Sequence, residues 1–465
     1  MSALKKNEMN KRKRTALIAL GTVATVCLAF LAVRMISRQN GGRTARVYVI
    51  GLDGATWDLL DPLIEQGKLP VFKKLKENGA WSRLRTFEPT LSAVVWTSIA
   101  TGKSMLKHGI VDWVFVNKQK IQVPYSSSEK RTPSIWEMMD ENGRRSVVLG
   151  WFVTDPPDAV KGVMVSDSFA PALYRNFSRK EGLRDFSDTV YPRAEFKGLL
   201  EYFNRIEREG ALSYPRLVRE MGIPDYLLKY RERYDEDTGR VPILGAWNSF
   251  LVYNRVEDLL VDRYLEKDDY DLFLAYYRFP DVFYHFGTLF LDKEYHDRID
   301  TVIENREPAA EDLAEFNLKM ADVSLPLLKD KEVLLEKIYD RAVKENAYLI
   351  IASDHGFRLT SKGYNHYGLP SGIPPPDGIL MILGPDVKRN AEIQATVYDI
   401  TPSILYLTGL PVGRDMDGRP LLEAFTSKRP VRTTVYTKMK HLPGKEDADR
   451  DRKKIEELKS LGYIK

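Results

Sequence analysis

The segment RVYVIGL (46–52) is a short apolar run that ends at Asp53. A run of this kind is typical of a strand that is buried on both faces of a sheet. Helical stretches lie between it and similar runs, for example at 69–78 and 133–142. Strands that alternate with helices predict an α/β fold, with a mainly parallel sheet flanked by helices on both faces. The similar runs are SVVLG (146–150), LFLAYY (272–277), YLIIAS (348–353) and GILMIL (378–383).

The strand pattern stops between about 170 and 265, where Tyr, Arg and Glu are frequent and the periodicity is helical. We interpret this stretch as a helical cap insertion over the carboxyl edge of the sheet, where ligands bind in open α/β folds. A peripheral helical subdomain that does not contact substrate is the alternative. The chain becomes polar after Leu421, and 426–465 forms a charged tail in which 445–458 predicts a solvated helix.

Residues 15–33, TALIALGTVATVCLAFLAV, carry no charge and follow a basic segment, 1–14. At about 1.5 Å per residue the run nearly spans a hydrocarbon core of roughly 30 Å. We expect an uncleaved transmembrane signal anchor over 15–36, because no small-x-small cleavage site follows the run; a cleaved signal peptide and a buried core helix are the alternatives. The basic segment favours a cytoplasmic N-terminus. The chain after a linker at 37–45 would then be periplasmic or extracellular, on a single-pass protein of the cell membrane.

The composition narrows the class of protein. The chain has 465 residues, of which 43% are hydrophobic, so a large core can form and a disordered or fibrous protein is excluded. Lys and Arg number 70 against 65 Asp and Glu, and much of the excess lies in the basic N-terminal segment, which argues against nucleic-acid binding. The single cysteine, Cys27, excludes an intrachain disulfide. Nothing in the composition indicates the oligomeric state.

Two patches place a carboxylate and a hydroxyl at the ends of predicted elements. Asp53 directly follows the first strand, and Ser92 precedes an apolar helical run that reaches Gly102. A hydroxyl at a helix N-terminus lies near unpaired N–H groups and the positive end of the helix dipole, which favour a phosphate oxygen or a deprotonated nucleophile. Taken alone, each residue could also be an ordinary helix cap.

Two further patches carry the residue types that bind metals. Asp281 and His285 are four residues apart, so on a helix both side chains can bind one cation. Asp354 and His355 follow the strand at 348–353, and a turn at Gly356 can bring both to one ion. Oxygen and nitrogen ligands without cysteine suit Zn²⁺ or Mn²⁺. Two such ions can activate a nucleophilic oxygen and stabilise an in-line phosphoryl displacement.

The order of these motifs resembles the type I phosphodiesterase/nucleotide pyrophosphatase branch of the alkaline phosphatase superfamily. The shared elements are an Asp after the first strand, P-T-x-[ST] before W-T-S-x-x-T-G and H-G-I, then D-x-x-x-H, then S-D-H-G. GILMILGPDV (378–387) and VYDITPSILYLTGLPVGRDMDGRPL (397–421) resemble the closing segments of that group. The resemblance therefore implies an alkaline phosphatase-like catalytic domain over 46–425.

The resemblance also implies roles for individual residues. Ser92 would be the nucleophile, would form a covalent phospho-enzyme intermediate and would contact the metal that activates it. That metal would be held by Asp53, Asp354 and His355, and a second metal by Asp281 and His285. His108, in the H-G-I element, corresponds to a structural position.

One departure from the family pattern concerns the second metal. A further histidine normally follows the S-D-H-G patch, but Pro374 stands where it is expected. The nearest substitute is His366, which is either a ligand or a surface histidine. If neither His366 nor water completes the site, the second metal would bind weakly or not at all.

These expectations together describe a metal-dependent hydrolase of phosphate esters, either phosphodiesterase/nucleotide pyrophosphatase-like or a phosphatase. It would use two divalent ions, zinc or alternatively manganese, and act on a phosphorylated small-molecule, lipid or glycan substrate. A phosphotransferase on lipid or glycan head groups and a degraded member that only binds phosphorylated ligands are the alternatives. A sulfatase is disfavoured, because SAVVW (92–96) does not match the C/S-x-P-x-R context that formylglycine formation requires.

Overall fold

The computed structural model describes residues 45–117, 119–178, 185–224, 243–287, 291, 293–305, 307–360, 363–367, 374–440 and 448–460. The chain divides into two compact units, Met1–Ala45 and Arg46–Lys465. Of the first unit, the structure describes Ala45 alone. The expected anchor at 15–36 lies outside the described residues. Within the described ranges, no helix has the length and apolar character needed to cross a bilayer.

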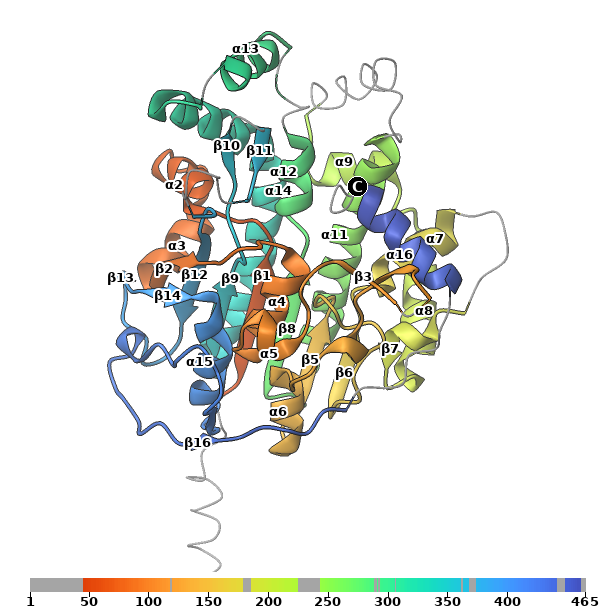
Figure 1. Ribbon diagram of the computed structural model, residues 1–465, viewed down its shortest axis with the longest axis vertical. Coiled ribbons are helices and arrows are strands. Elements are labelled where there is room, and N and C mark those ends of the chain that lie inside the picture. Colours follow the sequence, from red (N-terminus) through yellow and green to blue (C-terminus); the bar gives the residue numbers. More distant parts are fainter. Residues whose placement is uncertain are drawn as a thin grey trace, which may run out of the picture. The chain divides into compact units, whose positions relative to one another are not determined.

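A ten-stranded sheet forms the centre of the second unit (Figure 1). Its middle is parallel, as β1 pairs with β8 and β9, and β5 pairs with β8 and β6. The five apolar runs all form strands of this sheet, so the predicted α/β fold is confirmed. These strands are β1 (Val47–Leu52), β5 (Ser146–Leu149), β8 (Leu272–Tyr277), β9 (Tyr348–Ala352) and β12 (Gly378–Leu383). β6 (Gly162–Val165), which pairs with β5, was not predicted.

The outer strands differ from the parallel centre. β12 runs antiparallel to both β9 and β2 (Ala80–Arg85), and β7 (Val190–Tyr191) runs antiparallel to β6. β2 alternates buried with more exposed residues, so it lacks the continuous apolar run that marks the other strands. The short strands β13 (Ala391–Glu392) and β14 (Ala395–Thr396) pair with β2 at the edge of the sheet. The remaining short strands form separate two-stranded sheets: β3 (Val114–Val116) with β4 (Gln122–Pro124), β10 (Arg358–Thr360) with β11 (Gly363–Asn365), and β15 (Val412–Gly413) with β16 (Thr433–Thr434).

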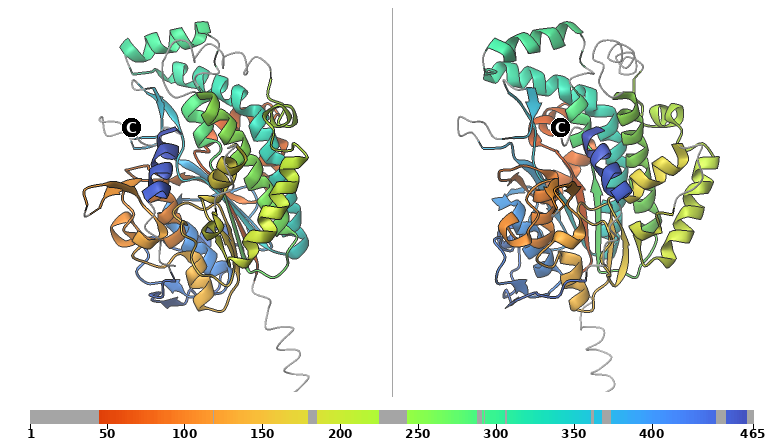
Figure 2. Two further views of the ribbon diagram at one scale, coloured as in Figure 1. Left: turned by 90° about the vertical axis from the view of Figure 1, so that its right-hand side faces the viewer. Right: turned by 45° about the vertical axis from the view of Figure 1, so that its right-hand side comes forward.

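Helices cover both faces of the sheet (Figure 2). Adjacent strand residues point to opposite faces, and β8 shows which helix lies on which side. Tyr276 packs against Trp96 of α4 (Ser92–Thr101), whereas the ring of Tyr277 contacts Lys331 of α14 (Ala310–Glu345). The other helices of the two layers and the connections include α2 (Trp57–Glu65), α3 (Pro70–Asn78), α5 (Met105–His108), α6 (Ile135–Glu141), α12 (Asp281–Gly287), α13 (Lys293–Asn305) and α15 (Ile400–Leu407).

The stretch interpreted as a helical insertion is helical for most of its described length. It contains α7 (Phe169–Ser178), α8 (Ala194–Arg208), α9 (Tyr214–Glu220) and α11 (Ile243–Leu265), with β7 between α7 and α8. α11 packs on β5 and β8, so this helix belongs to a layer that covers a face of the sheet.

The C-terminal tail folds back onto the domain. β16 pairs with β15, and the backbone N–H of Lys440 donates to Glu137 of α6 at 2.7 Å. The predicted tail helix is present as α16 (Ala448–Ser460). It is not simply solvated, because Leu458 is only 3% exposed and Lys454 pairs with Asp167 at 3.2 Å.

Candidate active site

Three aspartates lie at the carboxyl edge of the central parallel strands. Asp53 directly follows β1, and one residue separates Asp354 from the end of β9. Asp281 begins α12, shortly after β8. The three strands are adjacent and parallel, so their carboxyl ends meet at one edge. A backbone hydrogen bond joins the segments after β1 and β8, since the Asp281 N–H donates to the Asp53 carbonyl at 2.8 Å. All three carboxylates are fully buried.

Ser92 is the first residue of α4, and every residue of this helix is buried. Its hydroxyl lies 3.4 Å from Asp53 Oδ1. The hydroxyl therefore lies at the positive end of a ten-residue helix and beside a carboxylate of the cluster. This is the placement that the sequence predicted for a nucleophile.

His355 brings the aspartates into one group. Its Nε2 lies 3.4 Å from Asp53 Oδ1, 3.4 Å from Asp354 Oδ2 and 3.8 Å from Asp281 Oδ1. Ligands about 2.0–2.1 Å from a tetrahedral zinc ion are separated by roughly 3.3 Å from one another, so these spacings suit atoms that share one cation.

The facing atoms also lack other partners among the described residues. Asp354 Oδ2, His355 Nε2 and both carboxylate oxygens of Asp281 are buried without a hydrogen-bond partner. Buried polar atoms without partners are costly, and bound divalent cations would satisfy them. Asp53, Asp354 and His355 therefore fit a divalent metal.

The second polar atoms of Asp354 and His355, Oδ1 and Nδ1, face backbone groups. The N–H of Gly54 donates to Asp354 Oδ1 at 3.3 Å, and His355 Nδ1 lies 3.1 Å from the carbonyl oxygen of Gly356. A proton on Nδ1 would make this second contact a hydrogen bond and leave a lone pair on Nε2, facing the carboxylates.

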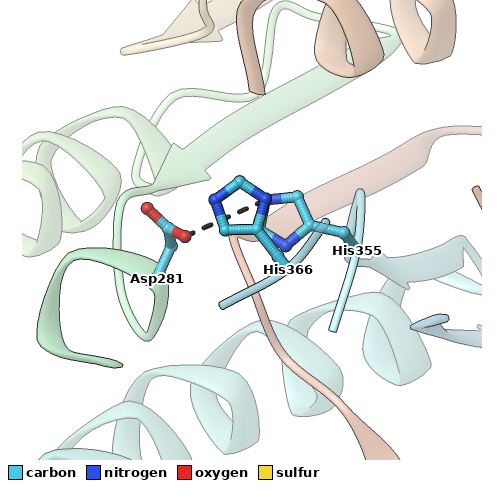
Figure 3. A group of neighbouring side chains, drawn as sticks. All are labelled: Asp281, His355 and His366. Atoms are coloured by element: carbon cyan, nitrogen blue, oxygen red, sulfur yellow. Dashed lines mark ion pairs between the residues drawn. The ribbon is translucent and has the colours of Figure 1, made fainter. Parts of the chain in front are cut away.

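A second group consists of Asp281, His355 and His366 (Figure 3). The His366 ring stacks on that of His355, with centroids 4.1 Å apart, and both imidazoles lie on the same side of Asp281 (Figure 3). His366 is only 3% exposed, so the surface-histidine alternative is wrong. Its backbone carbonyl accepts a hydrogen bond from the Thr90 hydroxyl at 2.8 Å, which joins this loop to the start of α4.

His285 lies beside this second group. Its Nε2 is 3.4 Å from Asp281 Oδ1, and its ring centroid is 5.3 Å from that of His366. The carbonyl of Pro374 instead accepts a hydrogen bond from Arg358. The structure thus places the imidazole of His366 beside Asp281, and His355 belongs to both groups.

The pKa values of the cluster reflect its burial. Burial, together with the charges of Asp354 and Asp281, raises the pKa of Asp53 well above its ordinary value. Burial likewise raises the pKa of Asp354. Burial also acts to raise the pKa of Asp281, but its three histidine neighbours outweigh it and lower that pKa. Carboxylates that repel one another in this way become a favourable set when a divalent cation binds.

His108 lies outside the cluster. Its Nε2 is 2.9 Å from the hydroxyl of Ser98, and the N–H of Ile110 donates to its Nδ1 at 3.2 Å. Burial lowers its pKa to about 3, so it is neutral at physiological pH. It connects α4 to the turn after α5, which agrees with a structural position.

Among the described residues that contact this cluster, the sequence assigned no role in the site to Thr90, Trp96 and Tyr276. Trp96 and Tyr276 both donate hydrogen bonds to Asp53. A signal for Trp96 was present, because it lies four residues after Ser92 and therefore on the same side of the helix. Tyr276 lies within an apolar strand, where nothing distinguishes it from a core residue.

The family model of type I phosphodiesterase/nucleotide pyrophosphatase matches residues 47–369 of the chain. That range contains the three aspartates, Ser92 and the three histidines described above. An extracellular sulfatase homologue from Drosophila melanogaster is 27% identical over 115 residues, and a sulfatase homologue from Caenorhabditis elegans is 32% identical over 133 residues. These matches cover 22% and 26% of this chain, and the chain spans 10% and 17% of the length of the two relatives.

Solved structures share the fold. A candidate sulfatase from Bacteroides thetaiotaomicron is 10% identical, with a TM-score of 0.50, and the superposition covers 84% of this chain and 76% of that one. At this identity the similarity concerns the α/β architecture alone.

Proposed function

Because the chain belongs to the type I phosphodiesterase/nucleotide pyrophosphatase family, we propose that it is a metal-dependent hydrolase of phosphate esters with Ser92 as its nucleophile. One observation carries the proposal: the Ser92 hydroxyl lies at a helix N-terminus, 3.4 Å from a buried carboxylate. The metal-binding atoms beside that carboxylate have no hydrogen-bond partner in the described part of the chain. Asp53, Asp354, His355 and Ser92 would hold the first ion. The second would be held by Asp281, His285 and His366.

In the proposed reaction, the Ser92 oxygen attacks phosphorus while the bond to the leaving alcohol breaks. Water then cleaves the phosphoserine, releasing phosphate or a phosphomonoester and restoring Ser92. Bound divalent ions would supply Lewis acidity, lowering the pKa of the hydroxyl and neutralising charge on the phosphoryl oxygens. The N-terminal N–H groups of α4 would stabilise the same negative charge.

The donor set supports zinc, with manganese as the alternative, because it contains carboxylates and imidazoles but no thiolate. The proposed substrate is a phosphorylated small molecule, lipid or glycan. The position of His366 supports catalysis over simple recognition, since the degraded alternative depended on a missing imidazole.

The nucleophile can be tested with Ser92→Ala in the full-length chain. We expect hydrolysis of p-nitrophenyl phosphate and of bis-p-nitrophenyl phosphate to fall by at least about 10³-fold, as is usual when a nucleophile is removed. Ser104→Ala, beyond the other end of α4, is the control. Mass spectrometry after an acid quench should find phosphate on the peptide that contains Ser92. Unchanged turnover in Ser92→Ala would exclude this role.

We also propose that residues 15–36 anchor the protein in the cell membrane, with the catalytic domain outside the cytoplasm. The support is the uncharged run at 15–33 with its basic flank. The full-length chain should sediment with membranes and resist carbonate extraction, whereas a chain that lacks residues 1–36 should not. Recovery of the full-length chain in the soluble fraction would contradict the anchor.

A further inference from the structure

The two oxygens of the Asp53 carboxylate have different surroundings. Asp53 Oδ2 accepts hydrogen bonds from the Tyr276 hydroxyl at 2.5 Å and from the Trp96 indole N–H at 3.0 Å. Asp53 Oδ1 faces the Ser92 hydroxyl and His355 Nε2, each at 3.4 Å. A carboxylate oxygen has two lone pairs. Both lone pairs of Oδ2 are therefore used by the aromatic donors, and only Oδ1 remains for a metal.

The two donors are themselves held in one orientation. The rings of Trp96 and Tyr276 pack edge to face with centroids 5.1 Å apart, and Trp151 packs on Trp96 at the same distance. Gly51 of β1 makes room for the indole, because a Cβ there would lie 2.7 Å from Trp96 Cη2. All of these side chains are buried, so neither donor can turn away from Asp53 without repacking the core.

We propose that Trp96 and Tyr276 are positioning residues that restrict Asp53 to binding metal through one oxygen, and thereby set the preference of the first site for a small four-coordinate ion. The proposal rests on the first metal site of the proposed function. Asp354 is restricted less, since the Gly54 N–H occupies one of the two lone pairs of its Oδ1. Single-oxygen carboxylates suit the tetrahedral coordination of zinc, whereas larger ions add ligands by taking both oxygens of a carboxylate.

Asp281 provides an internal contrast. Both of its oxygens are buried and have no hydrogen-bond partner among the described residues. The second site therefore keeps a carboxylate that can bind through either oxygen or both. The restriction to a small ion is then a property of the first site, and it comes from the aromatic pair.

The test compares zinc and manganese binding to Tyr276→Phe and to the native full-length chain, by calorimetric titration of metal-free protein. Removing one hydrogen bond from a metal-binding side chain typically weakens metal affinity about 10–100-fold. We expect a loss of this size for zinc at the first site and a smaller loss for manganese, because the released Oδ2 can serve as an additional ligand for the larger ion. Trp96→Phe should shift the preference in the same direction.

Tyr277→Phe is the matched control. Tyr277 is the next residue of β8, is equally buried and contacts Lys331 on the opposite face of the sheet. It should bind both metals as the native chain does. Native zinc affinity in a folded Tyr276→Phe, an equal loss for both metals, or the same loss in Tyr277→Phe would overturn the proposal. Because binding is measured without turnover, an absence of hydrolase activity would not affect the result.

Discussion

At the scale of single residues, the candidate site depends on which atom of each side chain is left unpaired. His355 and Asp354 each have one polar atom facing a backbone group and one facing the cluster. His366 is buried and stacked on His355, although its place in the sequence marked it only as a substitute. Its contribution to the second metal can therefore be measured separately from that of His285.

We expect His366→Ala to reduce the metal content of the purified chain from two ions to one. The second site would lose a neutral nitrogen ligand, whereas Asp53 and Asp354 of the first site would be untouched. Inductively coupled plasma mass spectrometry on dialysed protein gives the ratio directly. His108→Gln, at a buried histidine outside the cluster, is the control and should retain both ions. Two tightly held ions in His366→Ala would mean that His366 is not a ligand.

Gly51 is a position at which an added methyl group would collide with the Trp96 ring. A methyl group there would lie 2.7 Å from Trp96, and overpacking of this kind typically costs about 1–3 kcal/mol. We expect Gly51→Ala to lower the free energy of unfolding by an amount in this range, as measured by urea denaturation. Gly198→Ala, in the middle of α8 with only an Arg263 side-chain atom nearby at 3.6 Å, should stabilise the chain slightly, because alanine favours helix. Equal effects of the two substitutions would contradict the packing argument.

At the scale of elements, α11 carries buried acidic side chains on the face of the sheet opposite α4. Asp258 of α11 pairs with Lys331 of α14 at 2.5 Å, and both side chains are largely buried. The neighbouring Glu257 is also buried, and burial raises its pKa to about 8. Glu257 is therefore protonated in the folded state at neutral pH.

This shift predicts a pH dependence of stability. The folded-state pKa of Glu257 lies above the unfolded value, so its contribution is fully present below about pH 4.5 and is lost as the pH rises towards about 8. We expect Glu257→Gln to remove part of the stability loss between pH 5 and pH 8, on the order of 1–3 kcal/mol. Urea denaturation at the two pH values measures it. An unchanged pH dependence in Glu257→Gln would show that another group titrates.

At the scale of the whole molecule, the sequence predicted the centre of the sheet better than its edges. The five apolar runs formed strands because each is continuous and is buried on both faces. β2 was missed because arginines at 83 and 85 interrupt its pattern, and the antiparallel direction of β12 leaves no trace in an apolar run. Direction depends on how the connecting segments cross the sheet, which local pattern does not encode.

The same distinction holds for the site. Asp53, Asp281 and Asp354 could be placed together, since parallel strands bring their carboxyl ends to one edge. The position of His366 depends on how the segment after β11 returns to α4 through Thr90, and the roles of Trp96 and Tyr276 depend on packing across the sheet. The motifs therefore predicted the aspartates of the site, whereas the remaining residues depend on contacts between segments that are distant in the sequence.

The cluster also predicts that Asp53→Asn is more stable than the native chain without metal and less stable than it with metal. In metal-free protein, burial and the charges of Asp354 and Asp281 make an ionised Asp53 unfavourable, as its raised pKa indicates. Asp53→Asn removes that charge and keeps an oxygen for Trp96 and Tyr276. We therefore expect this variant to melt at a higher temperature than the native chain when both are stripped of metal. Zinc at 100 times its Kd should then stabilise the native chain by about 2.7 kcal/mol and the variant by much less, reversing the order. Thermal denaturation with chelator and with zinc tests both halves, and a metal-free variant that is less stable than the native chain would contradict the argument.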